Sequence, residues 1–329
     1  MDSGVHFTPW GYNYFRDETF RLLEDYWNDD GPQGWTKVER DFREMKQLGA
    51  NIVRLHLQFA RFMDAPGQLN QQNLDRLAQV IDLAEQLDLR LDITGLGTYR
   101  LKDVPNWYRN ANEKEHWNMQ AEFWEAIAKV CADRPTVFAL SLMNEPLATS
   151  SKQPRGQWTH PTAMDGQTYV EYINLDPSRR KPVDIARTWI RQMTAAIRKH
   201  DQRHLITVGL IWIDNANPEA WSGFPPKEIA PEVDFLAVHV YPDRGKVNVA
   251  LDSLARYKAG KPVLVEETFP MKCSPLEWRE FLEKSRGLAQ GWLGQYWSLS
   301  PADIRGSADL VHGLLRDQFD VLQNLNPNR

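Results

Sequence analysis

The stretch VFALSLMNEP, residues 137–146, decides how the rest of the chain is interpreted. Six of the eight residues before Asn144 are apolar, which is typical of a strand buried on both faces. The run then ends in an amide, a carboxylate and a proline, Asn144, Glu145 and Pro146. A carboxylate at the end of a buried strand is costly unless it is paired or used. Glu145 is therefore a candidate functional residue.

Seven further apolar runs alternate with segments of helical periodicity. The predicted strands cover residues 10–14, 51–57, 89–94, 137–143, 204–211, 233–240, 262–267 and 291–297. The predicted helices cover residues 37–48, 74–87, 117–131, 184–199, 226–230, 247–257, 275–286 and 308–325. Eight strands with about one helix in each gap predict an α/β fold, a (β/α)8 TIM barrel. We expect residues 1–329 to form a single barrel domain, because no linker, repeat or low-complexity tract interrupts the pattern.

A doubly wound open sheet is the second possibility for the fold. Its nucleotide-binding versions need a glycine-rich phosphate turn, and the sequence contains neither GxGxxG nor GxxxxGK[ST]. Two predicted loops are long, residues 95–116 after the third strand and residues 147–183 after the fourth. Both leave the carboxyl ends of strands, where barrel enzymes carry their sites.

The composition is that of a globular protein, with 42% hydrophobic and 25% charged residues. The net charge of −5 argues against nucleic acid or an anionic membrane as a partner. No apolar run reaches the ~20 residues of a membrane span. The N-terminal MDSGVHFTPW lacks the regions of a signal peptide, which leaves a cytoplasmic protein or a secreted one whose signal has been removed. Two distant cysteines, Cys131 and Cys273, predict no disulfide framework.

A second carboxylate pair stands at the end of the seventh predicted strand, Glu266 and Glu267. In a barrel this end lies at the same rim as Glu145. Side chains alternate along a strand, so Glu267 shares a face with Val263 and Val265, and Glu266 with Leu264. Alternation alone leaves open which glutamate faces the barrel axis. Glycoside hydrolysis uses two carboxyl groups on opposite sides of one cleft. One protonates the leaving oxygen, and the other attacks the anomeric carbon or activates water.

Several strand-end motifs resemble those of clan A glycoside hydrolases, most closely the cellulase-like family five. SLMNEP is similar to the strand-four signature of that clan, and KPVLVEETF to its strand-seven signature. VHVYP resembles the strand-six His-x-Tyr, NIVRLHL the strand-two arginine motif, QYW the strand-eight tryptophan platform and GYNY the strand-one opening. The resemblance implies a retaining β-glycoside hydrolase acting on a β-glucan or β-mannan type of glycan.

The resemblance also implies a role for individual residues. Glu145 becomes the acid/base and Glu267 the nucleophile, with Asn144 at the sugar 2-hydroxyl. The remaining implied contacts to the nucleophile or the sugar are Arg54, His239, Tyr241, Trp297 and Asn13. Family members often carry a histidine near the end of strand three, where this chain reads DITGLGTY. His56 or Tyr99 is left to fill that space.

Other chemistries have less support in the sequence. We expect no metal and no cofactor, because HExxH, His-x-His and paired CxxC motifs are missing from the sequence. A serine nucleophile is equally unsupported, because the sequence contains no GxSxG. A lyase or aldolase barrel would need a strand-end lysine or a metal. A non-catalytic sugar-binding protein on a decayed glycosidase barrel remains the alternative function. The sequence does not indicate an oligomeric state.

Overall fold

The computed structural model describes residues 7–161, 166–212 and 222–329. Eight parallel strands close into a barrel in the order β1-β12-β11-β10-β9-β6-β5-β2. They are β1 (Trp10–Tyr14), β2 (Ile52–Gln58), β5 (Arg90–Gly97), β6 (Val137–Asn144), β9 (Leu205–Leu210), β10 (Leu236–His239), β11 (Val263–Thr268) and β12 (Gly291–Gly294). The predicted TIM barrel is confirmed. The eighth strand is shorter than predicted and ends before Gln295.

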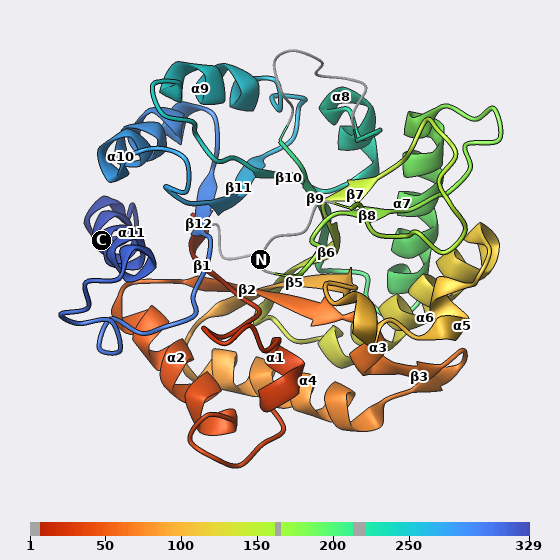
Figure 1. The fold of residues 1–329 in the computed structure, drawn as a ribbon, viewed down its shortest axis with the longest axis horizontal. Coiled ribbons are helices and arrows are strands. Elements are labelled where there is room, and N and C mark those ends of the chain that lie inside the picture. The colour runs from red at the N-terminus through yellow and green to blue at the C-terminus, as the bar shows by residue number, and fades with distance from the viewer. Residues whose placement is uncertain (1–6, 162–165, 213–221) are drawn as a thin grey trace.

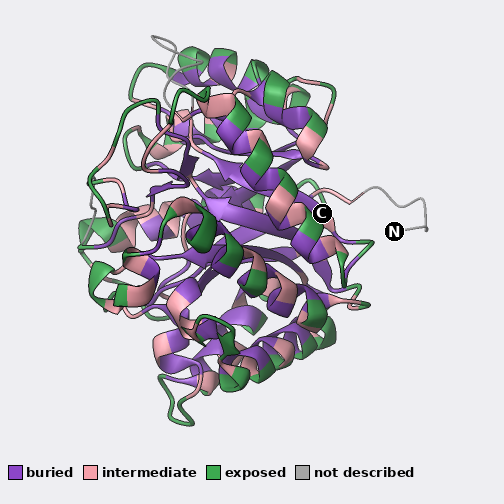
Figure 2. Cartoon of the chain, turned by 90° about the vertical axis from the view of Figure 1, so that its right-hand side faces the viewer, coloured by how far each residue is buried: buried purple, intermediate pink, exposed green. Residues whose placement is uncertain are grey.

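The barrel strands form an inner ring, and the longer helices lie outside it (Figure 1). These helices are α2 (Trp35–Gln47), α4 (Gln71–Gln86), α6 (Glu113–Cys131), α7 (Pro182–Arg198), α9 (Val247–Ala255), α10 (Pro275–Lys284) and α11 (Leu310–Leu325). Short helices are α1 (Leu23–Tyr26), α3 (Phe59–Phe62), α5 (Asn106–Arg109) and α8 (Pro226–Ile229), with 3-10 turns at Leu101–Asp103, Ala230–Glu232 and Ser285–Gly287. Each long helix has an apolar face toward the strands, and the strands themselves are buried (Figure 2).

The barrel interior has an apolar lower layer and a polar upper layer. The lower layer is a cluster with members from several strands: Ile52, Ala139, Phe235, Ala237, Leu264 and Leu293. One or two pleats further toward the carboxyl ends, the inward positions are polar and buried: Asn13, Arg54, Asp92, Ser141, Thr207, His239 and Glu266. Outward positions such as Val53, Leu140 and Val265 pack in the larger core between strands and helices. The polar upper layer is the floor of the candidate site.

The two long loops carry small structures of their own. The first contains α5, and the second contains the two-stranded sheet β7 (Pro146–Leu147) and β8 (Glu171–Tyr172). A further small hairpin, β3 (Met63–Ala65) with β4 (Gln68–Leu69), follows α3. Trp158 stacks on His116 with ring centroids 3.8 Å apart, and His116 stacks on Tyr108 at 4.0 Å. These stacked rings tie the second loop to the first loop and α6.

Among the described residues, no helix combines the length and the apolar character that crossing a membrane requires.

Candidate active site

Glu145 stands one residue beyond β6, where the strand leaves its regular register. Between Ser141 and Asn144, two residues of β6 lie opposite one residue of β9, which is a β-bulge. Glu145 has a φ of +46°, a left-handed conformation that non-glycine residues seldom adopt and that costs energy. Its N–H donates to the Gly209 carbonyl at 2.9 Å. The bulge and the turned backbone aim the Glu145 side chain into the barrel mouth, where it keeps 14% exposure.

A second bulge places Glu266 and Glu267 on the same side of β11. Val265 pairs with Val238 and Glu267 with His239, so Glu266 has no partner of its own in β10. Simple alternation would turn Glu266 inward and Glu267 outward with Val263 and Val265. Because the bulge adds one residue, both glutamates reach Arg54, at 3.1 Å for Glu266 Oε2 and 2.5 Å for Glu267 Oε1. Glu266 is fully buried, whereas the Glu267 side chain keeps 6% exposure.

The structure brings Glu145 and Glu267 together. One carboxylate oxygen of each lies with a ring nitrogen of His239 in a group whose atoms are all within 4.8 Å of one another. A short separation between two carboxyl groups, about 5 Å, is the spacing of glycosidases that form a covalent glycosyl-enzyme. Inverting enzymes need roughly 6.5 to 9.5 Å, which leaves room for a water molecule. The geometry therefore fits a direct attack by one carboxylate rather than activation of water.

Arg54 is the centre of the polar layer. Besides the two glutamates, its guanidinium donates to Asn13 Oδ1 at 2.9 Å, Asn144 Oδ1 at 3.0 Å and Thr94 Oγ1 at 2.8 Å. Burial disfavours its charge, but the negative charges of Glu266 and Glu267 outweigh burial and raise the pKa of Arg54. A fully buried guanidinium with this set of partners is a fixed cation beneath the carboxylates.

His239 contacts Glu145, and Tyr241 contacts Glu267. His239 Nδ1 lies 2.8 Å from Glu145 Oε1, and its Nε2 lies 3.1 Å from Glu266 Oε2. Burial lowers the pKa of His239, but Glu267, Glu145 and Glu266 together raise it to about 9. The Tyr241 hydroxyl donates to Glu267 Oε2 at 2.6 Å. Each oxygen of Glu267 thus accepts a hydrogen bond, one from Arg54 and one from Tyr241.

His56 and Tyr99 are brought together beside Asn13. The Tyr99 hydroxyl lies 2.6 Å from His56 Nδ1, and His56 Nε2 lies 3.0 Å from Asn13 Oδ1. Burial, with the nearby cations Arg54 and His239, holds the pKa of His56 well below its usual range. His56 is a neutral ring, and both it and Tyr99 are almost entirely buried, so their contacts are chiefly with the protein.

Asn144 is held by the protein at both ends of its amide. Its Oδ1 accepts from Arg54, and its Nδ2 donates to the Tyr169 carbonyl at 2.9 Å. An amide nitrogen carries two hydrogens, so Asn144 has a second N–H for a ligand.

The expectation of a platform at Trp297 does not fit the structure. Trp297 has no exposed surface and packs against Tyr12 and Phe319 in the layer between the barrel and α11. An indole without an exposed face cannot stack on a sugar. The preceding residue, Tyr296, is half-buried and lies instead against Phe15 and Phe269. The sequence alone does not tell which ring of the QYW motif is buried between the barrel and α11.

Sequence reasoning missed two residues that shape the candidate site, Asp92 and Gly209. Asp92 lies at an inward position of β5 opposite Arg54, and an aspartate within LRLDIT is a charge in an otherwise apolar strand, the same signal that singled out Glu145. Gly209 lies on β9, and a Cβ there would come within 2.9 Å of Glu266 Oε2, 3.0 Å of Arg54 Nη2 and 3.1 Å of His239 Nε2. Only the tertiary structure shows that this glycine makes room for three side chains.

Glu145, His239 and Glu267 also have the spacing of metal ligands. Both ring nitrogens of His239 lie against carboxylate oxygens, however, and its pKa of about 9 keeps the ring protonated near neutral pH. A protonated imidazole has no lone pair for a metal. The chemistry of this group therefore fits proton transfer better than metal binding.

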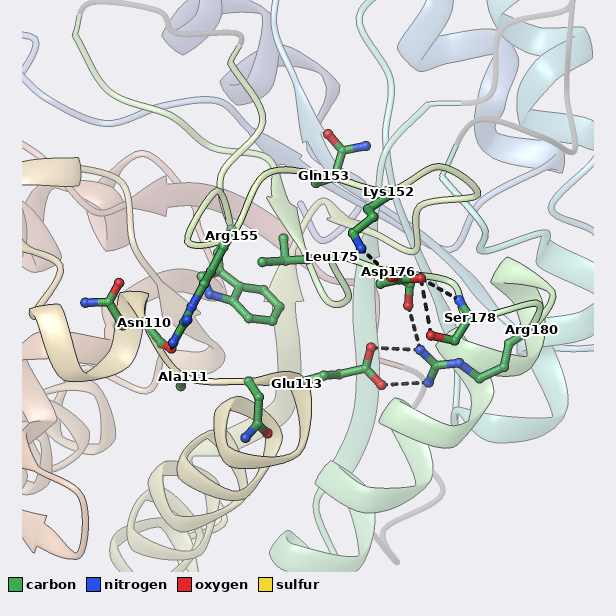
Figure 3. A pocket seen from close by; sticks show the side chains of 12 residues that line it. Asn110, Ala111, Glu113, Lys152, Gln153, Arg155, Leu175, Asp176, Ser178 and Arg180 are labelled. Carbon is green, nitrogen blue, oxygen red and sulfur yellow. Dashed lines mark hydrogen bonds and ion pairs between the residues drawn. The ribbon is translucent and has the colours of Figure 1, made fainter.

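A separate hollow of about 430 Å³ lies between the two long loops, away from these residues (Figure 3). Trp158 and Leu175 contribute its apolar surface. Its charged side chains pair with one another, Arg180 with Glu113 and Lys152 with Asp176. None of the predicted site residues lines this hollow. Trp158 is held within the loops, where its indole N–H donates to the Arg109 carbonyl at 3.0 Å.

Comparisons with known proteins match this chain to glycoside hydrolases. The family model described as cellulase, glycosyl hydrolase family 5, matches residues 12–273. Mannan endo-1,4-beta-mannosidase A of Emericella nidulans is 24% identical over 300 residues, which cover 79% of this chain and 70% of that protein. Mannan endo-1,4-beta-mannosidase 2 of Arabidopsis thaliana is 31% identical over 122 residues, 33% of this chain and only 22% of that protein.

Solved structures share the fold at low sequence identity. An exo-beta-1,4-mannosidase from an Opitutaceae bacterium superposes with a TM-score of 0.69 and 20% identity, over 97% of this chain and 56% of that one. The endo-1,4-beta-D-mannanase of Thermotoga petrophila superposes with a TM-score of 0.64 and 15% identity, over 97% of this chain and 99% of that one.

Proposed function

The chain belongs to glycosyl hydrolase family 5, and from this premise we propose that it hydrolyses a β-linked glycan of the β-mannan type with retention of configuration. The observation that carries the proposal is the convergence of Glu145 and Glu267, with one oxygen of each within 4.8 Å of the other, at one mouth of the barrel. The names of the similar proteins, endo- and exo-acting on β-1,4-mannan or mannosides, support the mannan type.

The first step forms a covalent intermediate. Glu267, ionised between Arg54 and Tyr241, attacks the anomeric carbon. The glycosidic C–O bond breaks, and Glu145 gives its proton to the leaving oxygen. His239 already occupies Oε1 of Glu145, which leaves Oε2 to carry the proton that is transferred.

The second step releases the sugar. Glu145, now a carboxylate, takes a proton from water while the water oxygen attacks the anomeric carbon and displaces Glu267. Two inversions at the same carbon give retention. In both steps the fixed cation Arg54 stabilises the carboxylate form of Glu267 as attacking or leaving group.

The test is the variant Glu267→Gln on β-1,4-mannan and mannooligosaccharides. We expect turnover to fall by at least about 10³-fold, because the nucleophile is gone, while circular dichroism and the unfolding temperature change little. Glu18→Gln, at an exposed position, is the matched control and should keep full activity. NMR of early products should show the β-anomer first.

Two outcomes would contradict the proposal. Full activity in Glu267→Gln would remove the nucleophile assignment. Binding of β-glucans, β-mannans or β-xylans without any product from the unaltered protein would instead favour a sugar-binding protein.

A further inference from the structure

Glu266 is more deeply buried than Glu145 and Glu267, and the two-step reaction gives it no chemical role. It is fully buried on β11 and cannot reach a sugar in the cleft. Its Oε2 lies 3.1 Å from both Arg54 Nη2 and His239 Nε2. Removing a carboxylate from water is costly, and a buried one is retained only where it has partners. Glu266 thus joins Arg54, which contacts Glu267, to His239, which contacts Glu145.

The other oxygen of Glu266 has a different partner. Within the described part of the chain, neither oxygen of Asp92 nor Oε1 of Glu266 meets an N–H or O–H donor of another group. The two carboxyl groups hydrogen-bond each other, which requires one shared proton. Burial and the charge of Glu266 raise the pKa of Asp92 well above its usual range. Against burial, Arg54 and His239 lower the pKa of Glu266. The proton therefore belongs to Asp92 and the negative charge to Glu266.

We propose that Glu266 is a positioning residue that holds Arg54 in place and keeps His239 charged through both steps of the reaction, with neutral Asp92 donating to it. The inference rests on the proposed function for its two steps. Glu266 touches no reacting atom and acts only through the two cations.

The net charge of the buried cluster depends on Glu266. Before reaction the cluster holds Arg54 and His239 as cations, Glu266 and Glu267 as anions, and Glu145 protonated, which sums to zero. In the glycosyl-enzyme Glu267 is an uncharged ester and Glu145 is an anion, so the sum is again zero. Glu266 is the one carboxylate whose charge is the same in both states. Without it the buried cluster would carry an excess positive charge, and His239 would tend to lose its proton.

The packing around Glu266 leaves room for its contacts with Arg54 and His239. The missing Cβ of Gly209 leaves the space in which Glu266, Arg54 and His239 meet. The titratable groups facing this cluster are Arg54 and neutral His56 on β2, Asp92 on β5, Glu145 after β6, His239 and Tyr241 at β10, and Glu267 beside it. From β1 the contact is uncharged, between Asn13 Nδ2 and the Glu266 carbonyl at 2.9 Å.

The test compares Glu266→Gln with Asp92→Asn. Removing an anion disfavours every proton in the cluster, so in Glu266→Gln the alkaline limb of the kcat/KM–pH profile should move to lower pH by about one unit. Asp92→Asn replaces a neutral donor by another neutral donor, so the alkaline limb should stay at the same pH as in the unaltered enzyme, even where kcat falls. Glu266→Asp keeps the charge, so the profile should stay in place even where kcat falls.

A second readout does not need catalysis. In protein labelled with ¹⁵N-histidine, the titration of the His239 ring, identified by its absence in His239→Asn, should move to lower pH in Glu266→Gln and not in Asp92→Asn. If the unaltered protein cleaves no glycan, the proposed function fails, and this titration still decides the charge assignment.

Two results would overturn the inference. One is a Glu266→Gln protein whose profile and His239 titration match those of the unaltered protein. The other is an Asp92→Asn protein in which either is displaced, because Asp92 would then carry the charge. If Glu266→Gln does not fold, Asp92→Asn and Glu266→Asp decide alone, since both must leave the His239 titration in place.

Discussion

At the scale of single residues, another buried carboxyl group lies close to the candidate site. Glu171 on β8 accepts the Thr98 N–H at 2.7 Å, and its own N–H meets the Glu145 carbonyl at 3.4 Å. It therefore joins the loop that carries Tyr99 to the backbone of Glu145. Burial raises the pKa of Glu171 to about 8, although hydrogen bonds from Thr98 oppose the shift. Near neutral pH the folded protein holds a proton here that the unfolded chain releases.

The sign of the pH dependence follows from that proton. The ordinary value is 4.5, so the folded state loses stability relative to the unfolded state as pH rises from 4.5 toward 8. Glu171→Gln carries no ionisable proton and should escape this loss. We expect its free energy of unfolding, relative to the unaltered protein, to gain more than about 1 kcal/mol between pH 5 and pH 8. Urea unfolding at both pH values measures it, and an equal difference at the two would contradict the assignment. Glu18→Gln is the exposed control.

At the scale of elements, caps and bulges decide where side chains stand. The helix α6 begins with a capping box: Asn112 Oδ1 accepts the Glu115 N–H at 3.0 Å, and Glu115 Oε2 accepts the Asn112 N–H at 2.9 Å. The sequence predicts α6 from residue 117, four residues late, because the polar first turn lacks the apolar spacing on which the prediction depends.

Replacing the cap tests this element without touching the site. Asn112→Ala removes an acceptor from the first turn of α6 and should lower the free energy of unfolding by about 1 kcal/mol. Asn112→Ser keeps an acceptor and should cost much less. Denaturant unfolding gives both values, and kcat/KM should be unchanged in each. Equal losses in the two variants would mean that the cap is not the stabilising contact.

At the scale of the whole molecule, the barrel closes only with the last part of the chain. The family match ends at residue 273, yet β12 pairs with both β11 and β1 and follows that point. The indole of Trp10 on β1 donates to the Leu322 carbonyl of α11 at 2.9 Å, and Phe319 packs on Trp297. The single domain over residues 1–329 remains a prediction, and this packing supports it.

Truncation tests that prediction. A chain ending at residue 309 loses α11 and exposes Trp10, Tyr12 and Trp297, so we expect an insoluble protein or one without a cooperative unfolding transition. Leu310→Ala, at a position with 78% exposure, is the control and should behave as the unaltered protein. A truncated chain that unfolds cooperatively would show that the barrel does not depend on α11.

The sequence by itself determined the barrel and the rim at which its strands end. Apolar strands that alternate with amphipathic helices favour a (β/α)8 barrel. This fold puts Glu145 and the Glu266–Glu267 pair at one rim. Asn13, Arg54, His239 and Tyr241 were also placed there by motif, and the structure brings all four into contact with one another or with the two carboxylates. Their roles remain proposals.

Only the tertiary structure decided which way particular side chains face. Strand periodicity puts Glu266 and Glu267 on opposite faces, and the bulge in β11 turns both toward Arg54. The same limit applies to Trp297, which the sequence placed under the sugar and which the structure buries against Tyr12 and Phe319. The partnership of Asp92 with Glu266 joins residues of distant strands. The physical reason is that a bulge depends on pairing with neighbouring strands, and a shared proton depends on the distance between two side chains. Local periodicity in the sequence encodes neither of these.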